Sequence, residues 1–214
     1  MTAALLTLAD SRLPAGGHTH SGGVEQAVAA GLVHDPSSLA AFLLRRLQTS
    51  GQVAAGLAAA ACRGGDLTAL DHEADARTPS PALRAASRQQ GRGLVRVGRR
   101  AWPSPLWDAL PATPHHPVAL GVAAAAGSLT ARDAAAAAAY LSVSGPATAA
   151  QRLLAMDPLT VAAVTARLAP EIDAVADAAG GRNGHLCRLP ADTDPLLDLL
   201  AEVHLARKDR FFAS

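Results

Sequence analysis

The sequence is poor in the aromatic and β-branched side chains that favour strands. Its 214 residues include only two Trp, one Tyr, three Phe and a single Ile, whereas 52 are Ala and 30 are Leu. Ala and Leu stand at the head of the helix-propensity scale. We therefore predict an all-α fold, and the composition argues against an all-β sandwich or a parallel-sheet enzyme.

Cysteine is rare, and neither sign of charge is in large excess. Cys62 and Cys187 lie far apart, outside any CxxC or Cys/His ligand spacing, and the first residues lack the basic start of a signal peptide, so we expect a cytoplasmic protein. A formal net charge of +1 gives no global basic field for nucleic acid or a membrane surface. The longest charge-free stretches, 111–131 and 134–151, contain proline and much alanine, so we expect no membrane span.

Capping residues and prolines divide the chain into helical segments. Residues 3–9 form a short apolar segment, and the proline-broken stretch 99–117 is expected to hold only a short helix. Elsewhere the cap signals predict helices from Ser21 to Gly31, from Asp35-Pro36 to Gly64-Gly65, from Asp66 to about Arg77, from Ser80-Pro81 to about Val97, and over about 117–126, 131–155, 158–179 and 195–207. Gly145-Pro146 marks a potential interruption of the segment 131–155.

The sequence pattern indicates that the helical segments belong to a single domain. In 158–179 the apolar residues recur at helical spacing and define a single stripe, formed by Val161, Val164, Leu168, Ile172, Val175 and Ala179. The chain has no internal repeat and no domain-sized linker. We therefore predict a single domain over residues 1–214, built as one compact bundle of about eight to ten helices, with a C-terminal docking tail at about 206–214.

The chain carries none of the common catalytic signatures. It has no GxxxxGK[ST] loop, no HExxH, no GxSxG, and no GxGxxG after a strand. The glycine pairs Gly16-Gly17 and Gly22-Gly23 favour tight turns over a phosphate loop, because no strand precedes them and no lysine follows. These motifs give no positive indication of an enzyme.

Histidines are the next candidates for chemistry. His18, His20 and His34 lie near one another in sequence, and His115-His116 form a second pair. Imidazole is a good ligand for nickel or zinc, but a strong site needs three or four converging ligands. We assign no metal site and keep His18 and His20 as candidates for transient contact. The alternative function they suggest is a helical metal-dependent hydrolase or metal-binding protein, with Glu25 as the carboxylate.

Five arginines recur at strict i, i+4 spacing on the predicted helix from Pro81, namely Arg84, Arg88, Arg92, Arg96 and Arg100. They lie on one face that shifts gradually around the helix axis, and their like charges repel one another. We therefore expect acidic groups to pair with them. Three acids of the preceding helix could do so, Asp71, Glu73 and Asp75. The alternatives are a partner-docking face or nucleic-acid contact together with Gln89 and Gln90, against which the net charge argues.

The C-terminal tail holds two of the three phenylalanines, Phe211 and Phe212, within its last four residues, and Arg210 precedes them. Two large apolar side chains at an exposed chain end are costly unless they dock. Docking on this chain and docking on a partner both remain open.

Four segments together resemble the UreF family of urease accessory proteins. The most specific runs from Leu13-Pro14 through Gly16-Gly17 to Ser21-Gly22-Gly23-Val24-Glu25. The others are Leu83-Arg84 with Ser87 and Gly91, His116-Pro117 with Gly121, and the closing residues from His204 to Arg210-Phe211-Phe212-Ala213-Ser214. The chain departs from the family pattern at His18, Ala82, Leu205 and Ala213 and in the region 151–160.

The resemblance implies an all-α, non-enzymatic adaptor that forms a homodimer. UreF-like proteins bind UreD (also called UreH) and the GTPase UreG, and the assembly delivers nickel to apo-urease. No cofactor is then bound stably, because nickel passes through the assembled complex. The tail would meet UreD, and the other motifs the dimer and UreG surfaces. The implied partner-binding residues are Pro14, Gly17, Ser21, Gly23, Glu25, Arg84, Ser87, Gly91, His116, Arg210, Phe211 and Phe212.

Overall fold

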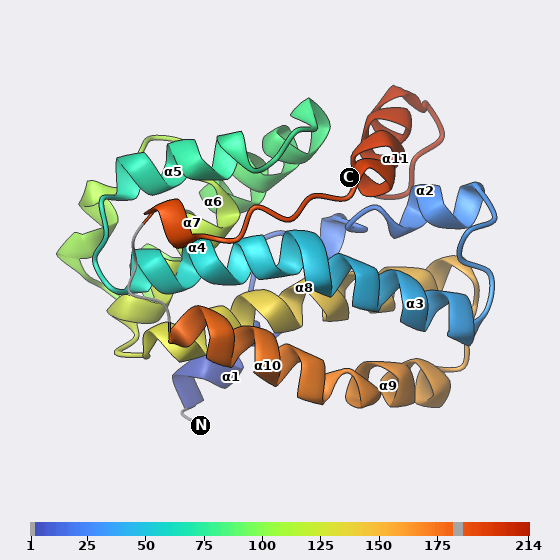
Figure 1. The fold of residues 1–214 in the computed structure, drawn as a ribbon, viewed down its shortest axis with the longest axis horizontal. Coiled ribbons are helices and arrows are strands. Elements are labelled where there is room, and N and C mark those ends of the chain that lie inside the picture. Colours follow the sequence, from blue (N-terminus) through green and yellow to red (C-terminus); the bar gives the residue numbers. More distant parts are fainter. Residues whose placement is uncertain (1–2, 182–185) are drawn as a thin grey trace.

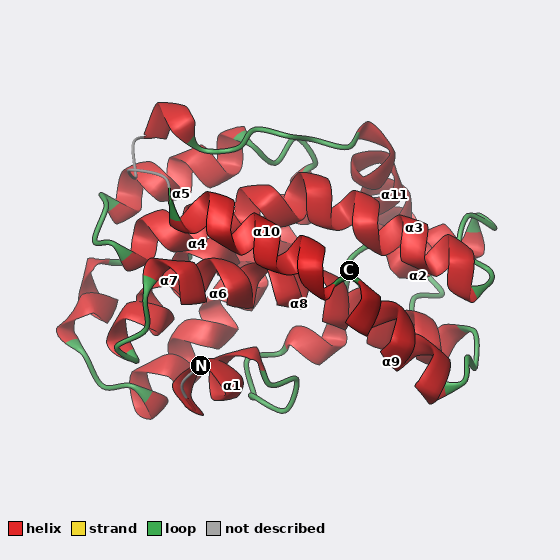
Figure 2. Ribbon diagram, turned by 60° about the horizontal axis from the view of Figure 1, so that its bottom comes forward, coloured by secondary structure: helices red, strands yellow, loops and turns green. Residues whose placement is uncertain are grey.

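A computed structural model describes residues 3–181 and 186–214, and within those ranges the chain contains helices and no strand (Figure 2). The predicted all-α bundle is thus confirmed. The helices are α1 (Ala3–Ala9), α2 (Val24–Ala29), α3 (Pro36–Arg46), α4 (Gln52–Cys62), α5 (Leu67–Ala76), α6 (Pro81–Ala101), α7 (His116–Ala126), α8 (Ala131–Leu153), α9 (Pro158–Arg167), α10 (Ala169–Gly180) and α11 (Pro195–Ala206). A π-helical turn, Leu47–Gly51, joins α3 and α4 into one continuous rod, as the sequence predicts for this stretch.

Helix α8 lies at the centre of the bundle, against the α3–α4 rod, α10 and α2 (Figure 1). Its buried side chains are mostly alanine: Ala134, Ala135, Ala137, Ala138, Ala139, Ala147, Ala149 and Ala150. Small side chains at a helix contact reduce the distance between the axes. The alanine excess of the sequence is therefore used to stack helices closely on both sides of α8.

The core divides into two large clusters. One is built from α4, α7, α8 and α10 and holds Trp107, whose indole N–H donates a 2.9 Å hydrogen bond to the carbonyl of Trp102. The other is built from α2, α3, α8, α9, α10 and α11 and holds Phe42 and Ile172. No helix of the described residues is long and apolar enough to cross a membrane.

Helix α8 continues through Pro146, where the sequence suggested an interruption. Proline has no N–H to donate to the carbonyl four residues earlier, which is that of Ser142. Nε of Arg46 donates a 3.1 Å hydrogen bond to this carbonyl instead. A side chain from α3 therefore replaces the missing backbone bond and stabilises the uninterrupted helix.

Two further boundaries differ from the sequence prediction. The segment 158–179 breaks at Leu168, because Pro170 lacks the N–H that would continue the helix, although its apolar stripe stays on one face. Helix α2 begins only at Val24, and its N-cap is Gly23, with φ 89°, and not Ser21. In 99–117, beyond the end of α6, only the short 3₁₀ turn Pro105–Ala109 precedes α7, as expected.

Candidate functional site

The N-terminal motif and the C-terminal part of the chain meet at Glu25. This residue lies in the first turn of α2, beside α11, which carries His204 in its last turn (Figure 1). Glu25 is 3% and His204 2% exposed. The Glu25 carboxylate accepts hydrogen bonds from Nε2 of His204 at 2.7 Å and from the backbone N–H groups of Phe211 at 2.8 Å and Phe212 at 3.0 Å.

Three donors stabilise the charged form of this carboxylate. Burial acts to raise the pKa of Glu25, but the hydrogen bonds from the backbone of Phe211, from His204 and from the backbone of Phe212 outweigh it, and the pKa lies below its ordinary value. Hydrogen bonds to an ionised acceptor are roughly twice as strong as neutral ones. Glu25 is therefore an ionised anchor for the tail.

The rest of the tail pairs with the N-terminal motif. Ala213 N–H donates to the carbonyl of Thr19 at 2.7 Å, Ser21 N–H donates to the carbonyl of Ser214, and the Ser214 hydroxyl shares a 2.6 Å hydrogen bond with Nδ1 of His20. The last residues thus lie beside the loop before α2 by backbone pairing, which the sequence does not reveal.

The phenylalanines of the tail have different environments. Phe212 is half-buried and packs against the cluster around α2, α3 and α11, whereas Phe211 is 86% exposed and Arg210 is also exposed. The sequence left open whether the tail docks on this chain. The structure shows that only part of the tail does so. The backbone and Phe212 dock on this chain, and Arg210 and Phe211 remain free to meet a partner.

The other residues of the N-terminal motif differ in burial. Pro14 and Gly17 are exposed in the loop before α2, and His18 is exposed beside them. Ser21 is buried, and its hydroxyl has no hydrogen-bond partner among the described residues. Burial lowers the pKa of His20, which keeps its imidazole neutral at pH 7. Within the described ranges, no group of three metal-ligating side chains contains His18 or His20.

A second buried polar cluster joins α5, α6 and α7 around Ser87. The Ser87 hydroxyl lies 3.0 Å from Nδ1 of His115 and accepts a 3.1 Å hydrogen bond from the N–H of His116. Nε2 of His115 lies 2.8 Å from Asp75. Burial lowers the pKa of His115, although the hydrogen bond with Asp75 opposes this. A neutral ring with its proton on Nε2 satisfies all these contacts, so Ser87 fixes the start of α7.

Arg88 completes this cluster. Its guanidinium donates to Asp71 at 2.9 Å and to Asp75 at 2.6 Å, and Asp71 also accepts the His115 N–H at 2.7 Å. Asp71, Asp75 and His115 are close enough to hold a metal ion, but the guanidinium already supplies their positive charge. Of the arginine series, Arg88 alone forms the expected ion pairs with Asp71 and Asp75 among the described residues, whereas Glu73 pairs with Arg77.

Two other residues of the α6 motif also face inwards. A Cβ at Gly91 would overlap the carbonyl oxygen of Pro114, so only glycine allows the 113–115 loop to lie this close to α6. Arg84 donates to the carbonyls of Thr78 at 2.7 Å and Pro79 at 3.2 Å. The rest of the series, Arg92, Arg96 and Arg100, is exposed and has no ion-pair partner within residues 3–181 and 186–214.

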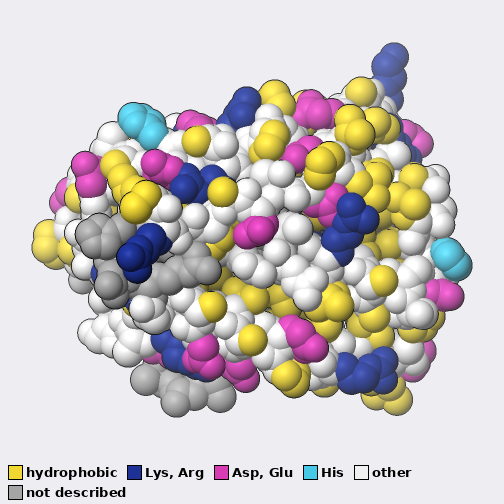
Figure 3. All heavy atoms as spheres, in the orientation of Figure 1, with side chains coloured by type: hydrophobic (Ala, Val, Ile, Leu, Met, Phe, Trp, Pro, Cys, Tyr) yellow, Lys and Arg dark blue, Asp and Glu magenta, His cyan; other side chains and the backbone are white. Residues whose placement is uncertain are grey.

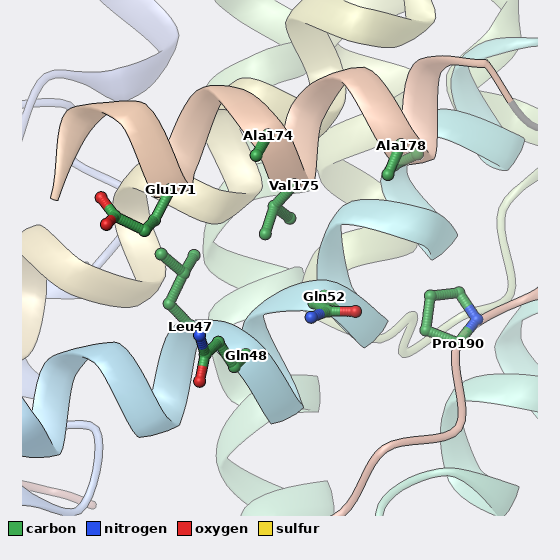
Figure 4. Close-up of a pocket in the computed structure, with 9 residues that line it drawn as sticks. Leu47, Gln48, Gln52, Glu171, Ala174, Val175, Ala178 and Pro190 are labelled. Carbon is green, nitrogen blue, oxygen red and sulfur yellow. The ribbon is translucent and has the colours of Figure 1, made fainter.

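A groove of about 220 Å³ lies between the α3–α4 rod and α10 (Figures 3 and 4). Its walls are mostly apolar, from Leu47, Ala174, Val175 and Ala178, with Gln48, Gln52 and Glu171 at its edges. One oxygen of Glu171 is buried without a hydrogen-bond partner among the described residues. The groove lacks the converging polar groups of a catalytic pocket.

Sequence reasoning missed the partners of these residues. The sequence marks His204 only as part of a closing motif, and Asp71 only as one of three acids on a helix. The spacing of Asp71 and Asp75 by four residues, ahead of a His-His-Pro segment, is the one local signal for the second cluster. No local signal indicates that Glu25 binds the tail.

Comparison with known proteins shows to which family the chain belongs. A family model for UreF matches residues 33–169. A urease accessory protein UreF from Mycolicibacterium vanbaalenii is 55% identical over 216 residues, which cover 99% of this chain and 98% of the relative. Proteins of the same name from Mycobacterium marinum and Mycobacterium tuberculosis are 53% and 46% identical, again over 99% of this chain and 98% of theirs. With over half of the chain matched by the model and nearly all of it by these relatives, the chain belongs to the UreF family of urease accessory proteins.

Proposed function

We propose that this chain acts in urease maturation as a non-enzymatic adaptor. It binds UreD (UreH) and the GTPase UreG and regulates the GTP-dependent delivery of nickel to apo-urease. In this proposal residues 1–214 act as a single domain in the cytoplasm, as a homodimer, and nickel passes through the assembled complex without a stably bound cofactor. Membership of the UreF family and the printed name of the relatives support the urease context.

The observation that carries the adaptor role is the exposed Phe211 on a fixed backbone. Its ring is 86% exposed, yet its own N–H is held by the buried Glu25 carboxylate at 2.8 Å. Binding energy at protein interfaces concentrates in a few aromatic and arginine anchors, and an anchor that is already positioned loses less entropy on binding. Phe211 and the neighbouring Arg210 are therefore proposed as the UreD contact.

The dimer and UreG surfaces are proposed around the N-terminal motif and α6. Pro14 and Gly17 are exposed there, and Arg92, Arg96 and Arg100 add an exposed basic face. Six motif residues that are buried or half-buried shape the loop and the helix that present this surface: Ser21, Gly23, Arg84, Ser87, Gly91 and His116.

The test is co-purification of tagged UreD with the wild-type chain and two alanine variants. Phe211→Ala removes the proposed anchor, and Leu159→Ala removes a comparably exposed apolar side chain, 80% exposed, on α9. We expect Phe211→Ala to lose most of the UreD and Leu159→Ala to retain it. Equal recovery of UreD with both variants would refute the tail assignment.

A further inference from the structure

A second cavity, of about 180 Å³, lies between the two clusters and is lined by Ser87 and His115 of one and by Ser214 of the other. It is bounded by the α3–α4 rod, the loop before α2, the starts of α6 and α7, and α11. Its polar lining includes Arg46, Ser50, His116, Asp194, Asp198 and Ser214. The chain end therefore forms part of the wall.

Arg46 is the unusual residue of this lining. Its Nε is used, because it donates to the Ser142 carbonyl that Pro146 leaves free. Its two terminal nitrogens have no hydrogen-bond acceptor and no carboxylate partner among residues 3–181 and 186–214. Burial lowers the pKa of Arg46 to about 10, so the group is still charged at pH 7. Arg46 is half-buried, and a charge that is partly removed from water is normally paired, because leaving it unpaired is costly.

Other charges on the wall already have partners. Asp194 forms a two-point ion pair with Arg45, in which the second bond is 2.7 Å long. Arg77 pairs with Glu73. Asp192 and Asp198 also line the cavity, but neither forms an ion pair with Arg46. Among the described residues, no carboxylate therefore forms an ion pair with Arg46, although Asp192, Asp198 and the chain end at Ser214 line the same cavity.

The guanidinium of Arg46 lies close to the loop before α2. A Cβ at Gly22 would lie 2.7 Å from Cγ of Pro146 and 3.3 Å from Cζ of Arg46, so the glycine allows the guanidinium to lie against the loop. His116 lines the same cavity, and burial, with a smaller contribution from His20, lowers its pKa to about 4. A neutral imidazole can donate one N–H to a ligand.

We infer that this cavity binds a small oxyanion, a carboxylate or phosphate group, through the terminal nitrogens of Arg46. The planar guanidinium matches two oxygens of either group at once. A cavity of about 180 Å³ has room for a free oxyanion. The site is independent of the proposed adaptor role.

The test is titration of the purified full chain with sodium phosphate and, separately, sodium acetate, at constant ionic strength adjusted with sodium chloride. Calorimetry reports affinity, and the assigned Nε–H resonance of Arg46 reports location. We expect saturable binding of at least one oxyanion, with a shift of the Arg46 resonance. Stronger binding of phosphate or of acetate then identifies the preferred group.

Arg46→Lys keeps the charge but removes the two-point geometry, and should weaken binding about tenfold. Arg96→Lys, on the exposed face of α6, is the matched control and should bind as the wild type does. The inference is overturned if neither oxyanion saturates, if Arg46 does not respond, or if the two variants bind equally. If Arg46→Lys does not fold, the wild-type resonance decides the question alone.

Discussion

His204 and Glu25 form a buried 2.7 Å hydrogen bond although 179 positions separate them in sequence. The bond joins the last turn of α11 to the first turn of α2. Because Glu25 also accepts the N–H groups of Phe211 and Phe212, one carboxylate fixes both the end of α11 and the path of the tail.

Replacing Glu25 by alanine should release the tail. The change leaves His204 and two backbone N–H groups without their acceptor, and removing one partner of a buried charged network costs about 3 kcal/mol or more. We expect a lower free energy of unfolding in urea and faster trypsin cleavage after Arg207 and Arg210. Asp192→Asn, at an exposed residue outside the tail, is the control, and equal cleavage of both variants would contradict the anchor role.

The same carboxylate should make the tail acid-sensitive. Because the folded-state pKa of Glu25 lies below its ordinary value of 4.5, its contribution to stability is complete above pH 4.5 and is lost as the pH falls through the folded-state pKa. The difference in unfolding free energy between the wild type and Glu25→Gln should therefore shrink below pH 4.5. Urea titrations from pH 3 to pH 7 measure it, and a difference that grows on acidification would contradict the assignment.

Much of the fold could be predicted because helix starts are encoded locally. Ser80 and Asp157, each followed by proline, cap α6 and α9 by accepting the N–H groups of Leu83 at 3.1 Å and Thr160 at 2.9 Å. The continuity of α8 through Pro146 could not be predicted in this way. It depends on Arg46, which comes from another helix.

The candidate site was predictable only as a set of positions. The family motifs mark Glu25, Ser87 and the tail, but hydrogen-bond partners such as His115 with Asp75 are set by how α5, α6 and α7 pack. Such long-range pairing is not encoded in spacing or propensity. The sequence therefore identified the residues and left their contacts to the structure.

Asp71 should be the most sensitive residue of the second cluster. It is buried and accepts hydrogen bonds from the His115 N–H and from Arg88. Asp71→Ala leaves a buried N–H and part of a guanidinium unpaired, so we expect a loss of about 3 kcal/mol in unfolding free energy. Arg96→Ala, an exposed α6 variant, should change it by less than about 0.5 kcal/mol. Urea unfolding measures both, and a similar small effect of both changes would show that the cluster adds little.

We expect the two neighbouring phenylalanines of the tail to differ, with Phe212 contributing to stability and Phe211 to binding. Phe212 packs against the core, so Phe212→Ala should reduce the unfolding free energy by about 1–3 kcal/mol. Phe211 is 86% exposed, so Phe211→Ala should change it by less than about 0.5 kcal/mol. Urea unfolding of both variants provides the comparison.

The same two variants test whether the exposed side chain of Phe211 binds a partner. If Phe211 contacts a partner, its loss should weaken UreD binding while the isolated chain keeps its stability, because the ring contributes little to the fold. Phe212→Ala should weaken binding only as far as it loosens the tail, which trypsin cleavage after Arg210 reports independently. A Phe211→Ala chain that is markedly less stable than the wild type would mean that the ring packs on this chain in solution, and its exposure could not then serve a partner.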